Sequence, residues 1–244
     1  MTTLRTSFNR FIHIALLLIA AVTTSAVFAS DDGGPDRLAA SRLPPSTQPF
    51  PIELAVGDVI FIRVSAKPFR EVAAATNSWT NHVGVIVAIE GNEPVIGEST
   101  FPVSRVTTLS KFIARSEGGH VAVARLKNQL TVEQQQQVFD AAKRRLGIFY
   151  DTGFDLHSRR QFCSRFVREV LAEATSVSVG EVETFSTLLA RNQKTNLGFW
   201  KTWYHGSIPW ERETVTPASL LNSPQLVLVF DGAVKRHAHL NALK

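Results

Sequence analysis

One strand-like segment that is apolar on both faces constrains the fold of this chain more than any other feature. The run Asn81–Glu90 (NHVGVIVAIE) places valine, isoleucine, alanine and glycine at consecutive positions. Successive side chains of a strand point to opposite faces of its sheet, so this run buries apolar groups on both faces. We therefore expect residues 81–90 to form a central strand.

Further strand-like runs precede and follow this segment. Residues 57–64 (GDVIFIRV) are rich in β-branched side chains and predict a buried strand. Residues 91–94 (GNEP) predict a turn, and residues 95–99 a strand that forms a hairpin with residues 81–90. Residues 121–126 and 226–230 predict two more strands.

Helical patterns lie mainly in the second half of the chain. Thr131 and Gln134 fit a capping box, Gly147 fits a helix stop, and the apolar stripe between them is Val138, Phe139, Ala142 and Leu146. A second amphipathic helix begins near Cys163 and is expected to bury Phe162, Phe166, Val167, Val170, Leu171 and Ala174. Residues 217–221 predict a short helix, and residues 176–215 show little pattern. The class is α+β, with a central antiparallel sheet and packed helices.

The N-terminus has the pattern of a secretory signal peptide. Arg5 and Arg10 precede an apolar run over residues 11–22, and small residues at Val27 and Ala29 predict cleavage after Ala29. An uncleaved membrane anchor is the alternative. We expect a signal peptide at 1–29, a flexible leader at 30–50, a folded domain at 51–232 and a basic tail at 233–244. The protein would then be periplasmic or secreted, and would contact a membrane only through the uncleaved signal peptide.

Charge excludes one class of partner. The formal net charge is +5, and removal of Arg5 and Arg10 leaves a modest positive excess. This excess is consistent with anionic surfaces of the cell envelope. No basic stripe interleaved with aromatic residues is present, so we expect no nucleic-acid partner. The oligomeric state is not predicted.

Cys163 is the only cysteine in the chain. Exported proteins usually pair their cysteines, so a lone thiol indicates either burial or chemical use. Its position at the start of an amphipathic helix favours use, because the helix dipole presents partial positive charge there and stabilises a thiolate.

A nucleophilic thiol needs a base and a third group that orients the base. Of the seven histidines, His82 is the best placed, at the entry to the central strand. Glu98 lies late in the next strand, which returns toward His82 if the two form a hairpin. The alternatives are a histidine bonded to a backbone carbonyl and a glutamate on the sheet edge. His157, six residues before Cys163, is a less favourable base because a short loop rarely gives the geometry.

These residues carry a family resemblance. The chain resembles the circularly permuted papain-like hydrolases related to NlpC-type cell-wall peptidases, in particular their YiiX and YebB subgroup, over roughly residues 51–232. The matching pieces are residues 57–60 (GDVI), 81–85 (NHVGV), 97–99 (GES), 147–151 (GIFYD), 162–164 (FCS) and 216–220 (TPASL). The resemblance implies a papain-like fold, with Cys163 as nucleophile, His82 as general base and acid, and Glu98 as the orienting residue. Many relatives carry Glu where this chain has Arg165, a residue expected to face outward.

The resemblance implies acyl transfer through a thioester. The backbone N–H of Cys163 is one candidate donor to the oxyanion. The second donor is left open among Gln161, Tyr150 and a backbone N–H near Gly57 and Asp58, and Ser164 is a further candidate for substrate contact. No cofactor is expected: Asp151 and Asp155 flank Gly153 and are interpreted as turn residues rather than metal ligands.

Three functions remain open at this point. The first is an exported thiol hydrolase that cuts amide bonds, with cell-wall peptides as substrate by family association. The second is a thiol acyltransferase or lipid esterase, which requires an apolar groove. The third is a catalytically silent binding domain. The clustered Trp200, Trp203 and Trp210 either pack in the core or line a groove wall.

Overall fold

The computed structural model describes residues 50–192 and 195–234. The predicted signal peptide, the leader up to residue 49 and the tail beyond residue 234 lie outside the described residues. Among the described helices, none is both long and apolar enough to cross a membrane.

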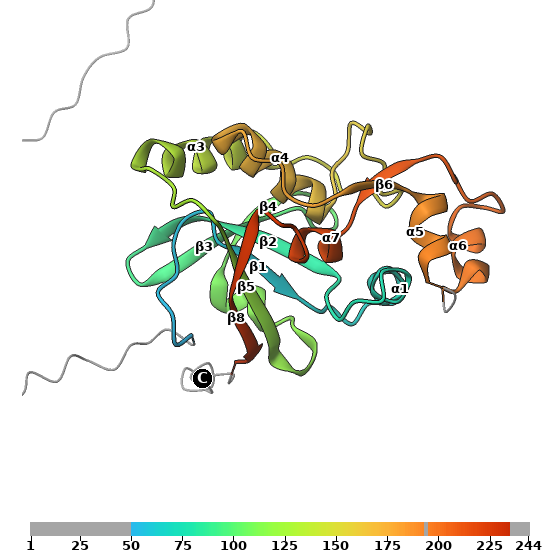
Figure 1. Cartoon of the computed structure of the whole chain (residues 1–244), viewed down its shortest axis with the longest axis horizontal. Coiled ribbons are helices and arrows are strands. Elements are labelled where there is room, and N and C mark those ends of the chain that lie inside the picture. The colour runs from blue at the N-terminus through green and yellow to red at the C-terminus, as the bar shows by residue number, and fades with distance from the viewer. Residues whose placement is uncertain (1–49, 193–194, 235–244) are drawn as a thin grey trace, which may run out of the picture. The chain divides into compact units, whose positions relative to one another are not determined.

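A six-stranded sheet with the order β4-β3-β2-β1-β5-β8 forms the centre of the fold, and every neighbouring pair in it is antiparallel (Figure 1). Its strands are β1 (Val59–Ile62), β2 (His82–Glu90), β3 (Glu93–Glu98), β4 (Arg105–Thr108), β5 (His120–Leu126) and β8 (Leu226–Ala233). A separate two-stranded sheet pairs β6 (Val182–Thr184) with β7 (Glu213–Val215). The helices are α1 (Lys67–Ala75), α2 (Leu109–Ile113), α3 (Val132–Lys143), α4 (Cys163–Thr175), α5 (Phe185–Arg191), α6 (Leu197–Trp203) and α7 (Pro217–Leu221), with a 3-10 turn at Glu117–Gly119. The expected α+β class is confirmed.

β2 lies inside the sheet between β1 and β3, as its sequence predicts. Val83 and Val85 belong to the apolar core that includes α3 and α4, whereas Ile86 belongs to the core on the α2 side. Figure 1 shows α3 and α4 together on one side of the sheet. Burial of both faces explains why this strand tolerates almost no polar side chain after His82.

The predicted hairpin of β2 and β3 is confirmed. Glu90 pairs with Glu93 across a two-residue turn that contains Gly91 at φ +61°. β3 covers residues 93–98 rather than the expected 95–99. Because the two strands are antiparallel, His82 at the start of β2 and Glu98 at the end of β3 lie at the same end of the hairpin.

α4 begins at Cys163 and buries all six of the apolar residues expected for it, from Phe162 to Ala174. The predicted capping box of α3, formed by Thr131 and Gln134, is also present. Two expectations for α3 are wrong. The helix ends at Lys143 and not at Gly147, whose N–H instead donates to the Ser104 carbonyl. Phe139 is partly exposed, and the residues that α3 buries are Val138, Ala141 and Ala142.

Two glycines of the hairpin allow helices to approach the sheet closely. A Cβ atom on Gly97 would lie 2.8 Å from Val87 and 3.2 Å from the Phe166 ring of α4. A Cβ atom on Gly84 would lie 2.5 Å from Ile96 and 3.0 Å from Phe112 of α2. The distances to Val87 and Ile96 are shorter than real Cβ contacts, and those to the two aromatic rings are tighter than usual. Glycine at these positions therefore lets α4 and α2 pack closely on the end of the hairpin that carries His82 and Glu98.

The weakly patterned stretch 176–215 contains β6, α5, α6 and β7. These elements enclose a separate apolar cluster of Ala75, Phe185, Leu189, Trp200 and Ile208. Each is seven residues or shorter, too short for a periodic pattern to emerge from sequence. The expectation of core packing holds for Trp200, whereas Trp210 is largely exposed.

Candidate active site

Cys163 is the first residue of α4, and its side chain is buried. The preceding residue, Phe162, has an extended backbone and offers no capping side chain to the helix. The amide N–H groups of the first turn therefore lack a capping side-chain partner and point their partial positive charge toward the beginning of the helix. Cys163 thus occupies a position that favours negative charge on sulfur.

His82 and Glu98 form a buried pair beside Cys163. His82 Nε2 lies 2.7 Å from Glu98 Oε2, and the two side chains are 2 % and 0 % exposed. Phe112 stacks on the imidazole, with 5.6 Å between ring centroids, and Phe69 meets it edge-on. These contacts leave the ring little freedom to rotate. They also exclude both alternatives raised from the sequence, since His82 Nε2 pairs with a carboxylate and Glu98 is inside the fold.

The pKa values of His82 and Glu98 are strongly shifted in opposite directions. Burial by itself lowers the pKa of His82, but the neighbouring Cys163 thiol and Glu98 outweigh burial and raise this pKa to about 9. Burial by itself raises the pKa of Glu98, but the hydrogen bond with His82 and the charge of Arg115 lower it to about 2. At neutral pH the pair is therefore an imidazolium and a carboxylate.

His82 Nδ1 is buried and forms no hydrogen bond with any described residue. Because Nε2 is occupied by Glu98, Nδ1 is the ring atom left to exchange a proton with the thiol that raises the His82 pKa. This arrangement has the three parts that an activated nucleophile needs: a thiol, a base beside it and a group that orients the base.

Two arginines that the sequence reasoning missed hold Glu98 in place. Arg115 follows α2 and donates to Glu98 Oε2 over 2.7 Å, and its guanidinium lies over the Phe112 ring. Arg105 of β4 donates to Glu98 Oε1 over 3.4 Å. Arg105 pairs directly with Glu98 in the sheet, so a prediction of β4 would have indicated it. For Arg115 the sequence gives no comparable signal.

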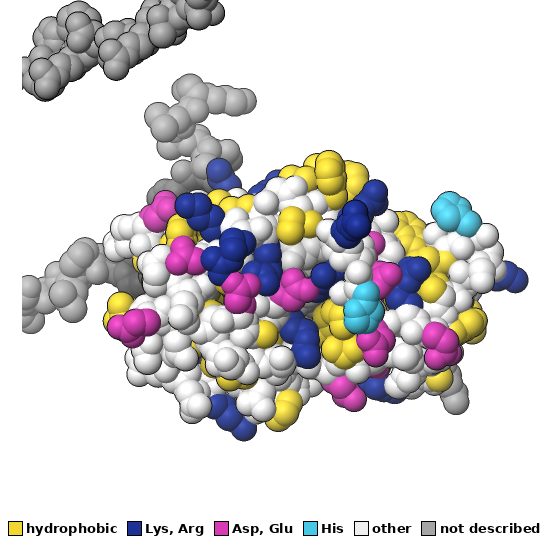
Figure 2. All heavy atoms as spheres, turned by 90° about the horizontal axis from the view of Figure 1, so that it is seen from above, with side chains coloured by type: hydrophobic (Ala, Val, Ile, Leu, Met, Phe, Trp, Pro, Cys, Tyr) yellow, Lys and Arg dark blue, Asp and Glu magenta, His cyan; other side chains and the backbone are white. Residues whose placement is uncertain are grey.

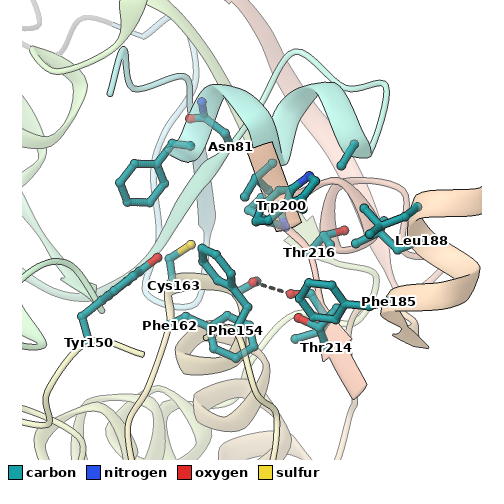
Figure 3. A pocket seen from close by; sticks show the side chains of 17 residues that line it. Asn81, Tyr150, Phe154, Phe162, Cys163, Phe185, Leu188, Trp200, Thr214 and Thr216 are labelled. Carbon is teal, nitrogen blue, oxygen red and sulfur yellow. Dashed lines mark hydrogen bonds between the residues drawn. The ribbon is translucent and has the colours of Figure 1, made fainter. Parts of the chain in front are cut away.

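Tyr150 is the predicted donor candidate that the structure brings to Cys163. Figure 3 shows its hydroxyl directed toward the Cys163 sulfur. The hydroxyl is buried and forms no hydrogen bond with any described residue. Burial raises the pKa of Tyr150 well above its usual value, and the adjacent Cys163 raises it further. Tyr150 therefore keeps its proton and remains a hydrogen-bond donor at neutral pH.

Asp58 does not reach this site, and the expectation of a donor there is wrong. β1 pairs with β2 so that Ile62 is opposite His82, which places Asp58 beyond the other end of β1. The Asp58 N–H donates to the Ala55 carbonyl, and its carboxylate accepts two hydrogen bonds from Arg125. The Gly57 N–H is likewise occupied, by the Ile86 carbonyl.

Gln161 and Ser164 lie next to Cys163 in sequence but have other partners. The Gln161 carboxamide donates to Glu169 and accepts from Ser104, and it does not line the pocket that contains Cys163. The Ser164 hydroxyl lines that pocket but donates to the Val215 carbonyl over 2.7 Å, which fixes α4 to β7.

The remaining polar candidates have structural roles. His157 is exposed and pairs with Glu213, so it is not a second base for Cys163. Asp151 accepts hydrogen bonds from the Gly153 and Asp155 N–H groups, which confirms its interpretation as a turn residue. Arg165 does not face freely outward: it pairs with Glu169 and donates to the Ser158 and Arg160 carbonyls, so it fixes the loop before Cys163.

A narrow apolar pocket opens beside the cysteine (Figure 3). Its space open to water-sized molecules is about 30 Å³. The side chains that line it come from α1, the loop before α4, α5, α6 and β7, and include Phe69, Val72, Tyr150, Phe154, Phe162, Cys163, Phe185, Leu188, Leu189, Trp200 and Val215. Trp200 therefore packs in a core and also forms part of the pocket wall.

A family model described as permuted papain-like amidase enzyme, YaeF/YiiX, C92 family, matches residues 53–230. The chain belongs to this family. It is accordingly a cysteine hydrolase of papain-like fold, and amide hydrolysis is its general reaction. The resemblance found in the sequence is confirmed, including the YiiX subgroup.

Two relatives support this membership. The uncharacterized protein YiiX of Escherichia coli strain K12 is 32 % identical over 194 residues, which are 80 % of this chain and 95 % of YiiX. The crystal structure of YiiX from Escherichia coli O157:H7 superposes with a TM-score of 0.65 at 30 % identity, and the match covers 73 % of this chain and 97 % of that one. That structure is described as a metalloprotein. Within residues 50–192 and 195–234 of the present chain, no group of three or more His, Cys, Asp or Glu side chains is placed to hold a metal ion.

Proposed function

We propose that this protein is an exported thiol amidase in which Cys163 is the nucleophile, His82 the general base and acid, and Glu98 the residue that orients His82. The observation that carries the proposal is the buried His82–Glu98 pair beside the thiol at the start of α4. Export rests on the N-terminal signal pattern, which precedes the described residues.

The proposed reaction begins from an ion pair in which the proton of the Cys163 thiol already lies on His82. The thiolate attacks the carbonyl carbon of the amide, and the oxyanion accepts hydrogen bonds from the Cys163 backbone N–H and the Tyr150 hydroxyl. His82 then gives its proton to the leaving amine as the C–N bond breaks, which leaves a thioester on Cys163. Neutral His82 then takes a proton from water, and the resulting hydroxide attacks the thioester. The carboxylic acid leaves, and the sulfur departs as a thiolate beside the protonated His82, which restores the starting ion pair.

Tyr150 is proposed as the second donor to the oxyanion because the alternatives have other partners. Gln161 is bonded to Glu169, and Asp58 lies at the far end of β1. The Tyr150 hydroxyl, in contrast, is buried beside the sulfur without a hydrogen bond. A buried donor without a partner is costly in a resting enzyme, and a developing oxyanion would supply the missing acceptor.

Amide bonds of cell-wall peptides are the first candidate substrate, in line with export. A second candidate is an amide or ester whose acyl part is apolar, and one specific observation favours it. The pocket beside Cys163 is lined by Phe154, Phe185, Leu188 and Trp200, and its exposed surface is almost wholly apolar. An acyl chain would remove this surface from water, whereas a charged peptide would leave its own polar groups without partners. The space of about 30 Å³ requires one of these side chains to move before such a chain enters.

Product analysis by mass spectrometry tests the proposal. The protein and its Cys163→Ala variant are incubated separately with peptidoglycan fragments, N-acyl amino acids and phospholipids. Amide cleavage by the wild-type protein that is absent from the variant supports the thiol amidase. Acyl products from phospholipid alone would favour the esterase or acyltransferase, and the absence of any Cys163-dependent product would favour a silent binding domain.

A further inference from the structure

Two phenylalanines stand exposed on loops beside the active site. Phe101 is 71 % exposed and Phe149 is 65 % exposed. Backbone hydrogen bonds join their segments to each other and to the segment before Cys163: the Tyr150 N–H donates to the Pro102 carbonyl, and the Gln161 N–H donates to the Phe149 carbonyl. Phe149 therefore lies beside the Arg159–Gln161 segment.

Arginines gather next to these phenylalanines. A surface hollow of about 310 Å³ is lined by Ile148, Gln161 and seven charged side chains. Five of these are arginines and two are glutamates, so the hollow has a net charge of +3. The charged residues are Arg144, Arg145, Arg159, Arg160, Arg165, Glu169 and Glu173. Figure 2 looks onto this side of the molecule and shows Lys and Arg side chains gathered over α3 and α4 with acidic side chains between them.

The arginines of the hollow differ in how they are used. Arg145 and Arg165 pair with the glutamates of α4 and are mostly buried by these contacts. Arg159 and Arg160 are exposed, and their guanidinium groups form no hydrogen bond or ion pair with the described residues. The uncompensated charge is thus concentrated in the segment that lies beside Phe149.

We propose that Phe101, Phe149, Arg159 and Arg160, named here the docking face, bind the surface of a bilayer rich in anionic lipids. Arginine guanidinium groups hydrogen-bond to lipid phosphates, and the phenylalanine rings enter the boundary between headgroups and acyl chains. Exposed aromatic rings beside unpaired basic side chains suit this interface better than they suit water. This proposal goes beyond the proposed reaction, because binding of the bilayer does not depend on which amide is cleaved.

The docking face is attached directly to the active site. Phe149 precedes Tyr150, and Arg160 is three residues before Cys163. A bilayer bound to this face would hold the protein with Tyr150 and the start of α4 near the lipid surface. Since the same short segments carry both groups of residues, binding of lipid would also restrain the loop that presents the nucleophile.

Co-sedimentation with vesicles tests the docking face. The full chain and an Arg159→Gln, Arg160→Gln double variant are mixed with vesicles of phosphatidylcholine alone or with added phosphatidylglycerol. A Lys127→Gln, Lys201→Gln double variant changes the net charge equally at exposed positions outside the docking face. We expect the arginine variant to bind anionic vesicles about 30-fold more weakly than wild type, the factor for about 1 kcal/mol per basic side chain. The lysine variant should bind within about threefold of wild type. All variants share the same N-terminal segment, so it cancels from the comparison.

A local probe makes the result specific. Because Cys163 is the only cysteine, the Cys163→Ala, Phe149→Cys variant accepts one environment-sensitive fluorophore at residue 149. We expect a blue shift with anionic vesicles, and none from the same label at Val227, an exposed apolar residue of β8. Equal losses by the two double variants, or an unshifted probe at residue 149, would each overturn the proposal.

Discussion

The protonation of His82 is the property of the site most sensitive to its neighbours, and removal of the Cys163 sulfur should change it most. Burial is the largest single influence on His82 and favours the neutral ring, so the cation persists only because Cys163 and Glu98 oppose burial together. In a Cys163→Ala variant, Glu98 opposes burial alone. We expect the pKa of His82 to fall from about 9 to near or below its usual value of 6.5.

The free energy of this change follows from the shift of the His82 pKa. A move from 6.5 to about 9 is worth about 3 kcal/mol at roughly 1.4 kcal/mol per pKa unit. At pH 7 the ring is then about 99 % protonated in the wild type. In the variant the protonated fraction at pH 7 should fall to about a quarter or less.

Nitrogen NMR of the imidazole ring measures both states across pH, with a His82→Gln variant to assign the signal among the seven histidines. Titration of His82 near 9 in the wild type and near 6.5 without the sulfur is the expected result. If His82 still titrates near 9 in Cys163→Ala, Glu98 alone holds the charge and the thiol is not its partner. If the wild type already titrates near 6.5, the site contains no ion pair at neutral pH.

Four further outcomes follow from the same geometry. A Tyr150→Phe variant should lose about 100-fold in kcat/KM, the usual cost of one oxyanion donor, while the thiol keeps its rate of alkylation by iodoacetamide, a reaction with no oxyanion; equal loss in both assays would contradict the proposed role. Urea unfolding should show stability from His82 complete below pH 6.5 and lost as pH rises through about 9, because its folded pKa is raised; a loss of about 3 kcal/mol is expected, and a flat profile would refute it. Gly97→Ala should cost about 1–3 kcal/mol in unfolding free energy, since its Cβ would lie 2.8 Å from a neighbouring methyl group; an unchanged melting temperature would contradict this packing. Arg115→Met should shift the acid limb of the pH–rate profile upward, because Arg115 helps to lower the pKa of the orienting carboxyl; Arg105→Met, at 3.4 Å and half exposed, is the matched control and should shift it less.

The sequence predicts local structure well where one pattern persists over many residues. β2 is apolar on both faces for most of its nine residues, and α4 repeats its apolar stripe over thirteen. The sequence therefore predicts the bounds of β2 to within one residue, and it predicts the start and the buried face of α4. Long-range contacts are different: the Arg115 that follows α2 gives no indication in the sequence of its contact with Glu98. Contacts of this kind depend on how distant segments approach each other, which periodicity does not encode.

The candidate donors to the oxyanion illustrate the same limit. Tyr150 and Asp58 lie in pieces shared with the family, and Gln161 directly precedes another. Only the register of β1 against β2 and the side-chain direction of Gln161 separate these three candidates. Neither is fixed by the identity of the residues. A one-residue change in register would exchange the two faces of a strand.

The site consists of one hairpin, which carries His82 and Glu98, and of the start of α4, which follows much later in the sequence and carries Cys163. His82 and Glu98 belong to one hairpin closed by a two-residue turn, so their pairing needs only short-range contacts. Cys163 reaches them only because α4 packs on β2 and β3, where Gly97 lets the Phe166 ring lie against the strand. A disturbance of this packing should therefore separate the thiol from a base that stays paired and oriented. Substitutions at the α4–sheet contact are expected to slow alkylation of Cys163 near neutral pH while the His82–Glu98 hydrogen bond persists. A change that breaks the hairpin would instead remove both.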